Sequence, residues 1–145
     1  MPARHRSRRR ALQMLFEWDM RRGDADEAIA HYYEIATDDE DTAQPDAFAE
    51  ELVRGTIEKQ AEIDRTIESK SEHWRIGRMP AVDRNIVRLA VFEMSQNRVP
   101  PVIVINEALE LAREFSGDES LAFINGVLDA VHRDTQAVFQ TEAGA

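Results

Sequence analysis

The sequence predicts an all-α fold on three observations. Apolar residues recur at helical spacing through several long stretches, and no pair of alternating apolar and polar runs indicates paired strands. Proline occurs only at positions 2, 45, 80, 100 and 101, which leaves long stretches in which a helix can continue. The 145 residues are 43% hydrophobic and 32% charged, as is typical of a globular protein, so we expect one domain spanning residues 1–145.

The expected helices begin or end at residues that cap or break a helix. Gly23 supplies a stop for the first helix, and Asp24 an N-cap for the second. Pro80 suits a first helical turn, whereas Pro100–Pro101 interrupts the chain. Gly117–Asp118 provides a break and an N-cap before the last helix. In order, the helices are expected over 3–22, 24–35, 46–67 and 80–94, from 106 onward, and over 118–139.

Several segments leave their structure open or predict none. The pattern over 46–67 fits one long helix or two shorter ones. Residues 102–105 could form a short strand, but the helical spacing that follows at once favours a helix. Residues 37–45 contain four consecutive acids and indicate a solvated loop, and 73–79 is expected to be a connector. A frayed tail is expected over 140–145.

Charge is distributed unevenly along the chain. The formal net charge is −10, but residues 1–23 carry +5, residues 24–51 carry −11 and residues 52–145 carry −4. Charges separated by more than about 8–10 Å are screened at physiological salt, so a local cationic segment can bind an anion despite the average. That segment is an N-terminal arm over residues 1–10, whose arginines are Arg4, Arg6, Arg8, Arg9 and Arg10.

Several classes of site are excluded by the residues present. The chain has no cysteine, four scattered histidines, and neither a glycine-rich phosphate loop nor a GxSxG motif. We therefore expect no catalytic residue, metal site or cofactor. No window approaches the roughly 18–20 apolar residues of a membrane span, and the arginines at 8–10 lack the apolar stretch of an export signal. A soluble, cytoplasmic protein is expected.

Four segments of the chain have patterns that go beyond composition. They include Arg8-Arg9-x-Ala11-Leu12-Gln13-x-Leu15-Phe16, Trp74-Arg75-Ile76 with Asp83-Arg84-x-Ile86-x-Arg88, Val104-Ile105-Asn106-Glu107-Ala108, and Phe123-Ile124-Asn125-Gly126-Val127-Leu128-Asp129. In this order and at this spacing, the four segments resemble the bacterial NusB family of transcription antitermination factors. The resemblance implies about seven helices in two packed helical subdomains. It also implies a non-enzymatic factor that acts beside RNA polymerase in rRNA transcription. Its partner there is NusE, a small-subunit ribosomal protein, and together they hold the single-stranded boxA RNA of the nascent leader.

The resemblance also implies which residues contact RNA. The five arginines of the arm suit phosphate because guanidinium groups make forked hydrogen bonds and stack on bases. Arginine at a helix N-terminus opposes the helix dipole, which favours a reason outside folding. Aromatic rings hold single-stranded RNA by stacking, and the family places RNA-contacting aromatics at Phe16, Phe115 and Phe123. Gly117 and Glu119 belong to the same loop, where Ser116 departs from the glycine that usually follows the position of Phe115.

The NusE contact is implied at the start of the helix that follows Pro80. Asp83 matches an acidic contact position there, and Arg84 and Arg88 are expected to take part. A carboxylate facing a basic ribosomal protein is electrostatically sensible. The sequence leaves the oligomeric state of the free protein open, with a homodimer among the options.

Two alternatives are weighed against this interpretation. The first is an interaction scaffold without RNA binding that acts through the acidic segment 24–51; five arginines within the first ten residues count against it. The second is the NusB-like domain of an RNA cytosine methyltransferase. The sixteen residues that follow Asp129 leave no room for a cofactor-binding domain, so this alternative would require a fragment.

Overall fold

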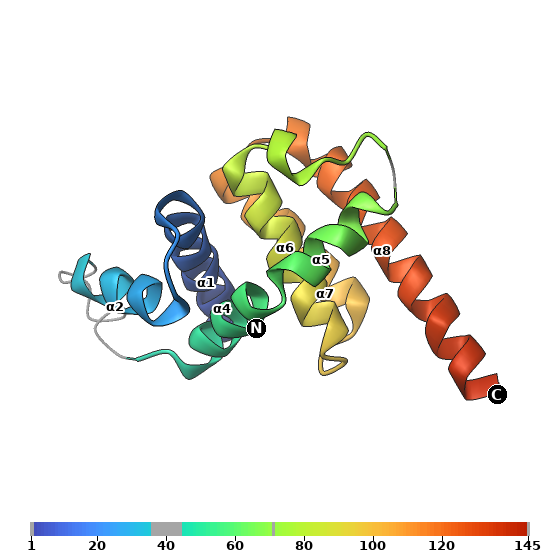
Figure 1. Cartoon of the computed structure of the whole chain (residues 1–145), viewed down its shortest axis with the longest axis horizontal. Helices are drawn as coiled ribbons and strands as arrows, with labels where there is room; N and C mark the ends of the chain where they lie inside the picture. Colours follow the sequence, from blue (N-terminus) through green and yellow to red (C-terminus); the bar gives the residue numbers. More distant parts are fainter. Residues whose placement is uncertain (1, 36–44, 71, 145) are drawn as a thin grey trace. The chain divides into compact units, whose positions relative to one another are not determined.

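The computed structural model describes residues 2–35, 45–70 and 72–144, with side chains over 4–35, 45–70 and 72–133. Over this part of the chain there are seven α-helices, one short 3₁₀ helix and no strand, which confirms the all-α fold (Figure 1). The elements are α1 (Pro2–Arg21), α2 (Ala25–Ile35), α4 (Ala47–Glu58), α5 (Gln60–Glu68), η1 (Ile76–Arg78), α6 (Ala81–Ser95), α7 (Pro101–Phe115) and α8 (Glu119–Gly144). They form two compact units, unit 1 over residues 1–59 and unit 2 over residues 60–145.

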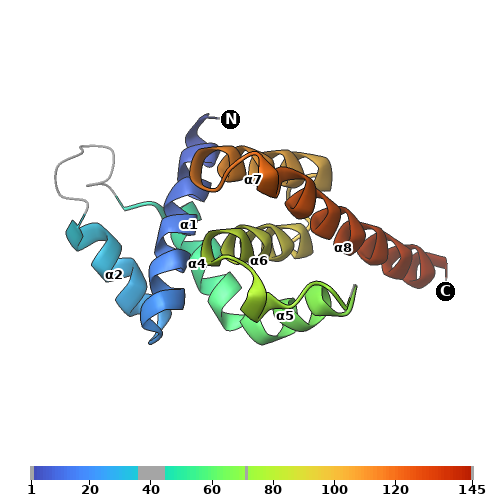
Figure 2. The same cartoon turned by 90° about the horizontal axis from the view of Figure 1, so that it is seen from above.

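The described part of unit 1 contains three helices, in which α1 contacts both α2 and α4, and these two contact each other (Figure 2). α1 ends where Arg22 and Gly23 adopt positive φ angles of 62° and 102°. The indole N–H of Trp18 donates to the carbonyl of Gly23 at 3.0 Å and fixes this turn. Asp24 then caps α2, because its Oδ1 accepts from the backbone N–H of Glu27 at 2.8 Å. The predicted stop and N-cap are confirmed.

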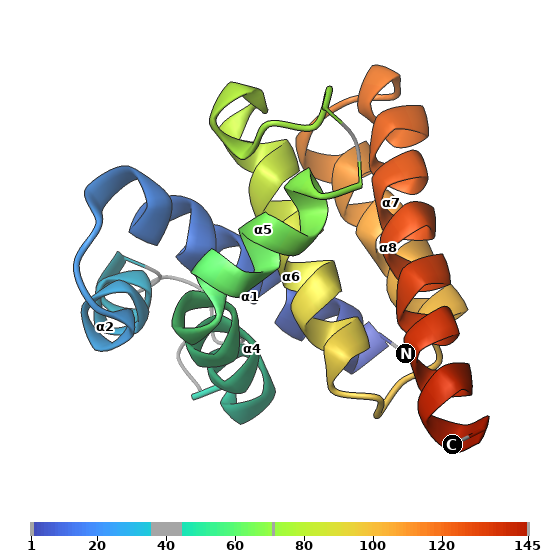
Figure 3. The same cartoon turned by 45° about the vertical axis from the view of Figure 1, so that its right-hand side comes forward.

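Unit 2 is built around α6, which contacts α5, α7 and α8. Every residue of α6 from Asn85 to Met94 is buried, in agreement with the nearly continuous apolar pattern there. α7 and α8 contact each other and lie side by side in Figure 3. The connector over 73–79 contains only the short helix η1.

The structure decides two segments that the sequence left open. Residues 46–67 form two helices, α4 and α5, which are separated at Lys59. Residues 102–105 belong to α7 and not to a strand, because α7 starts directly at Pro101. Its buried residues Val104, Ala108, Leu111 and Ala112 follow helical spacing, and this packing overrides the strand preference of the β-branched run.

Two other expectations concern residues at the margins of the described chain. The acidic loop over 37–45 lies outside the described residues except for Pro45. The side chains of the tail over 140–145 are likewise outside them, and its fraying stays a prediction. Among the described helices, none combines the length and apolar character that crossing a bilayer requires.

Candidate nucleic-acid interface

One exposed face of α1 combines basic and aromatic side chains. Its members follow each other at spacings of three and four residues, which places them on the same side of a helix. We call this face the α1 stripe; it consists of Arg6, Arg9, Gln13, Phe16 and Met20. Arg9 is half-buried and the other four are exposed, with Phe16 retaining 39% of its accessible surface. The stripe therefore brings two of the predicted arginines and one predicted aromatic ring onto a common surface.

The other three candidate arginines lie off this stripe. The guanidinium carbons of Arg4 and Arg8 lie 4.9 and 5.7 Å from the ring centroid of Phe48 on α4. Arg8 and Arg10 are buried, whereas Arg4 is exposed. Arg10 donates from Nη1 to Oδ2 of Asp46 at 2.8 Å. The cationic arm is thus divided between an exposed face and contacts that hold α1 against α4.

Asp46 joins α1 to the beginning of α4. Its Oδ1 accepts from the backbone N–H of Ala49 at 3.0 Å, which makes Asp46 the N-cap of α4. The Ser7 hydroxyl lies 3.0 and 2.8 Å from its two carboxylate oxygens, and Arg10 completes the group. Burial by itself raises the pKa of Asp46, but the hydrogen bonds from Ala49, Ser7 and Arg10 outweigh it, so the pKa is lowered. This anion offsets the unfavourable position of arginine near the N-terminus of α1.

The second set of predicted residues gathers where α7 meets α8. We call residues 115–120 the α7–α8 corner. Phe115 ends α7 with 37% of its surface exposed, and Phe123 is half-buried one turn into α8. Gly117 has φ of 153° and donates its N–H to the carbonyl of Ala112 at 2.9 Å. Exposed Glu119 begins α8, so the corner offers an aromatic face beside a carboxylate.

Asp83 is placed beneath this corner and not on the surface. It lies in the first turn of α6 and is only 3% exposed. Its Oδ2 accepts from the Ser120 hydroxyl at 2.9 Å, and its Oδ1 accepts from the Ser116 hydroxyl. The acidic group that the resemblance assigns to a partner contact is therefore occupied within unit 2.

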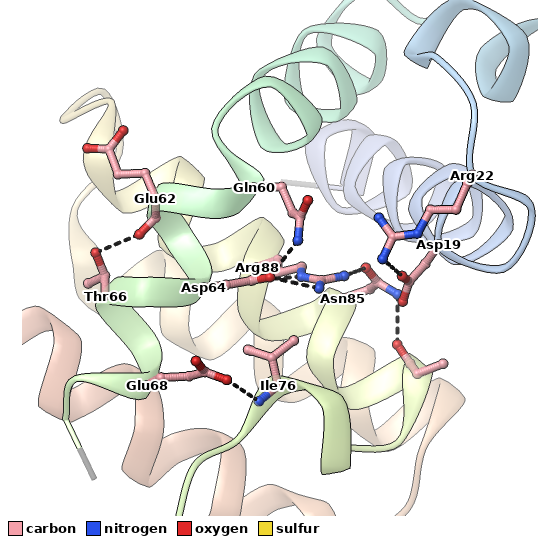
Figure 4. A network of polar contacts seen from close by, with 11 residues as sticks. Asp19, Arg22, Gln60, Glu62, Asp64, Thr66, Glu68, Ile76, Asn85 and Arg88 are labelled. Atoms are coloured by element: carbon pink, nitrogen blue, oxygen red, sulfur yellow. Dashed lines mark hydrogen bonds and ion pairs between the residues drawn. The ribbon is translucent and has the colours of Figure 1, made fainter. Parts of the chain in front are cut away.

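Arg88 is also internal, with 2% of its surface exposed. Its Nε and Nη2 donate to the two oxygens of Asp64 at 2.9 and 3.0 Å, a forked ion pair that joins α6 to α5 (Figure 4). Its Nη1 donates to Asn85 at 3.2 Å, and Gln60 donates to the same aspartate. Arg88 thus has a structural position, and of the two predicted partner-contact arginines only Arg84, which is half-buried, reaches the surface.

Several residues of these sites were not expected from the sequence. Asp46 and Phe48 meet the arginines of α1 across roughly forty positions of chain, and no local pattern predicts such a pairing. The serines of the α7–α8 corner likewise gain their role from Asp83, more than thirty residues away. The exposed stripe could have been found, because its members repeat at spacings of three and four. Within the part of the chain that the structure describes, no group of side chains could hold a metal ion.

Comparison with known proteins identifies the family. The model of the NusB family matches residues 5–133. A transcription antitermination protein NusB of Solibacter usitatus is 54% identical over 92% of this chain and 91% of its own length. One of Koribacter versatilis is 46% identical, again over 92% of this chain and 91% of its own.

Solved structures give the same result. A crystal structure of antitermination factors NusB and NusE in complex with double-stranded RNA aligns with a TM-score of 0.78 and 27% identity. That alignment covers 92% of this chain and 98% of the other. The solution structure of NusB from Aquifex aeolicus aligns with a TM-score of 0.77 and 28% identity, covering 92% and 89% of the two chains. The chain therefore belongs to the NusB family, whose members are transcription antitermination factors and not enzymes.

Proposed function

We propose that this protein is a cytoplasmic RNA-binding factor that, together with NusE, holds the single-stranded boxA element of nascent rRNA leaders beside RNA polymerase. The observation that carries the proposal is the α1 stripe, on which Arg6 and Arg9 share an exposed face with Phe16. Family membership supports it, as does the similar structure that contains NusB, NusE and RNA.

The α1 stripe supplies the affinity that does not depend on base sequence. Arg6 and Arg9 contact backbone phosphates, and Phe16 offers a face on which a base stacks. Arg4 adds positive charge from the neighbouring surface. Arg8 contacts Phe48 and Arg10 contacts Asp46. Both arginines contribute indirectly, because these contacts hold α1, the helix that carries the stripe, against α4.

The α7–α8 corner supplies base preference. Asp118 and Glu119 are exposed in the corner and Glu114 is exposed directly before it, and three carboxylates disfavour a phosphate at this position. A carboxylate accepts hydrogen bonds from the amino groups of bases, as it does from cytosine. We therefore assign stacking to Phe115 and Phe123, base-edge recognition to Glu119, and the close turn between them to Gly117. Arg84 is the residue assigned to the NusE contact, whereas Asp83 and Arg88 are buried and do not touch the partner.

The test measures binding of the full chain to a fluorescently labelled boxA strand and to a scrambled strand, with and without NusE, across salt concentrations. Deleting residues 1–10 is not a clean test, because it removes buried Ser7, Arg8 and Arg10 together with the stripe. The variants are Arg6→Gln, Arg9→Gln and Phe16→Ala. Arg21→Gln is the matched control, since Arg21 is an exposed arginine of α1 that lies off the stripe.

We expect a log–log salt slope of about −2 to −4 for the wild type, because each single-strand phosphate contact contributes about −0.7. Arg6→Gln and Arg9→Gln each make the slope less steep by about 0.7. Phe16→Ala leaves the slope unchanged and weakens binding by about 1–3 kcal/mol, the value of one stacked base. If all three variants bind RNA like the wild type while NusE binding persists, the protein is an interaction scaffold and the proposal is wrong.

A further inference from the structure

We infer that Asp83 is a positioning residue for RNA recognition, which holds the α7–α8 corner in place from beneath instead of contacting a partner. The inference rests on the proposed function for its consequence in RNA binding. Its structural basis is independent of that function. The buried carboxylate of Asp83, in the first turn of α6, accepts hydrogen bonds from Ser116 and Ser120, which lie on either side of Gly117.

The two serines are placed so that both ends of the corner depend on one anion. Ser116 directly follows Phe115 at the end of α7, and Ser120 lies in the first turn of α8. Their hydroxyl oxygens are 2.9 Å apart. Each hydroxyl has one proton, so only two of the three contacts in this triangle can be hydrogen bonds at one time. The anionic oxygens of Asp83 are the stronger acceptors and take both protons.

This arrangement restrains the residues assigned to base recognition. The chain between the serines contains Gly117, whose φ of 153° would be strained for other residues. Because glycine has no side chain, the backbone here can adopt many conformations. Without the hydrogen bonds to Asp83, the corner would retain the backbone hydrogen bonds of Ser116 and Gly117 to Ala112 but lose these two side-chain hydrogen bonds to α6. Phe115 and Glu119, each of which directly precedes one of the serines, would then sample more orientations.

The first experiment does not involve RNA. Amide hydrogen exchange is measured on the full chain for Asp83→Ala, Asp83→Asn and the double variant Ser116→Ala/Ser120→Ala. We expect exchange over residues 115–123 to accelerate about tenfold in Asp83→Ala and in the double serine variant, with unit 1 unchanged. Asp83→Asn should retain part of the protection, because its amide accepts from one serine and donates to the other. Unchanged exchange at the corner in Asp83→Ala would overturn the inference.

The second experiment measures the affinity ratio of boxA over scrambled RNA in the absence of NusE. We expect Asp83→Ala to lower this ratio about tenfold, the size of one weakened base stack, without a change in salt slope. The serine substitutions should add nothing in the Asp83→Ala background, because all three remove the same restraint. Arg84→Ala is the contrasting variant and should alter binding only when NusE is present.

The outcomes separate the two proposals. If Asp83→Ala weakens binding only in the presence of NusE and leaves exchange unchanged, Asp83 is a partner contact and the inference is wrong. If the wild type shows no preference for boxA, with NusE or without it, the proposed function fails. The exchange measurement then still decides whether Asp83 holds the corner.

Discussion

Arg84 and Arg88 lie one helical turn apart on α6, yet Arg84 reaches the surface and Arg88 is buried. Arg88 is buried in a forked pair with Asp64, and removing one member of a buried pair leaves the other charge uncompensated. We predict that Arg88→Ala lowers the free energy of unfolding by about 3–5 kcal/mol, measured by urea denaturation. Arg88→Lys should cost less, because lysine keeps the charge but cannot form the fork.

The matched control for Arg88 is Arg65→Ala, an exposed arginine on α5, the helix that contains Asp64. Its effect on the free energy of unfolding should stay within about 0.5 kcal/mol. We also expect folded Arg88→Ala to bind NusE as the wild type does. Reduced NusE affinity with unchanged stability would instead assign Arg88 to the partner surface.

At the scale of elements, the attachment of α1 to α4 depends on the ionised form of Asp46. Its pKa is lowered in the folded protein, so the unfolded chain binds more protons and the carboxylate contributes stability above the ordinary pKa. That contribution is lost as the pH falls below about 4 and through the lowered pKa. We predict that Asp46→Asn, which keeps the N-cap but not the charge, lowers the free energy of unfolding by about 1–2 kcal/mol at pH 7. The variant should also lose less stability than the wild type as the pH falls.

The measurement follows unfolding of unit 1 by fluorescence of the buried Trp18, in a Trp74→Phe background, between pH 3 and pH 7. Asp26→Asn is the matched control, because Asp26 pairs with Arg54 across the same unit but its side chain is 75% exposed. An exposed ion pair contributes little to stability, so Asp26→Asn should lose as much stability at low pH as the wild type does. If Asp46→Asn also loses as much, the acid sensitivity of unit 1 originates in other residues.

At the scale of the whole molecule, local sequence patterns predict the helices well and the roles of polar residues poorly. The stop at Gly23, the cap at Asp24 and the apolar periodicity of α6 follow from neighbouring residues, so their structure could be predicted. The division of the arginine arm could not be, because it depends on α4 meeting α1. Asp83 shows the same limit: its first-turn position predicts a helix start, and only tertiary packing reveals the serines that occupy it.

The net charge of −10 is the property of the whole molecule that bears most directly on RNA binding. Scrambled RNA binds through electrostatics at any favourable surface, whereas the proposed function holds boxA at the α1 stripe and the α7–α8 corner. Neutralising exposed acids outside both sites should therefore strengthen scrambled binding more than boxA binding. Suitable residues are Glu34, Glu58 and Glu62, which are all exposed, and changing each to Gln gives a net charge of −7.

We predict that this triple variant binds scrambled RNA about two- to fivefold more tightly at low salt, and that the gain disappears near 1 M salt, where the screening length is about 3 Å. The matched control replaces the same three residues by Asp, which preserves the charge of −10. Binding is measured for both strands with each variant at both salt concentrations. If the Asp control gains as much as the Gln variant, the effect is local to those side chains. The acidic balance of the chain would then have no part in limiting non-specific RNA binding.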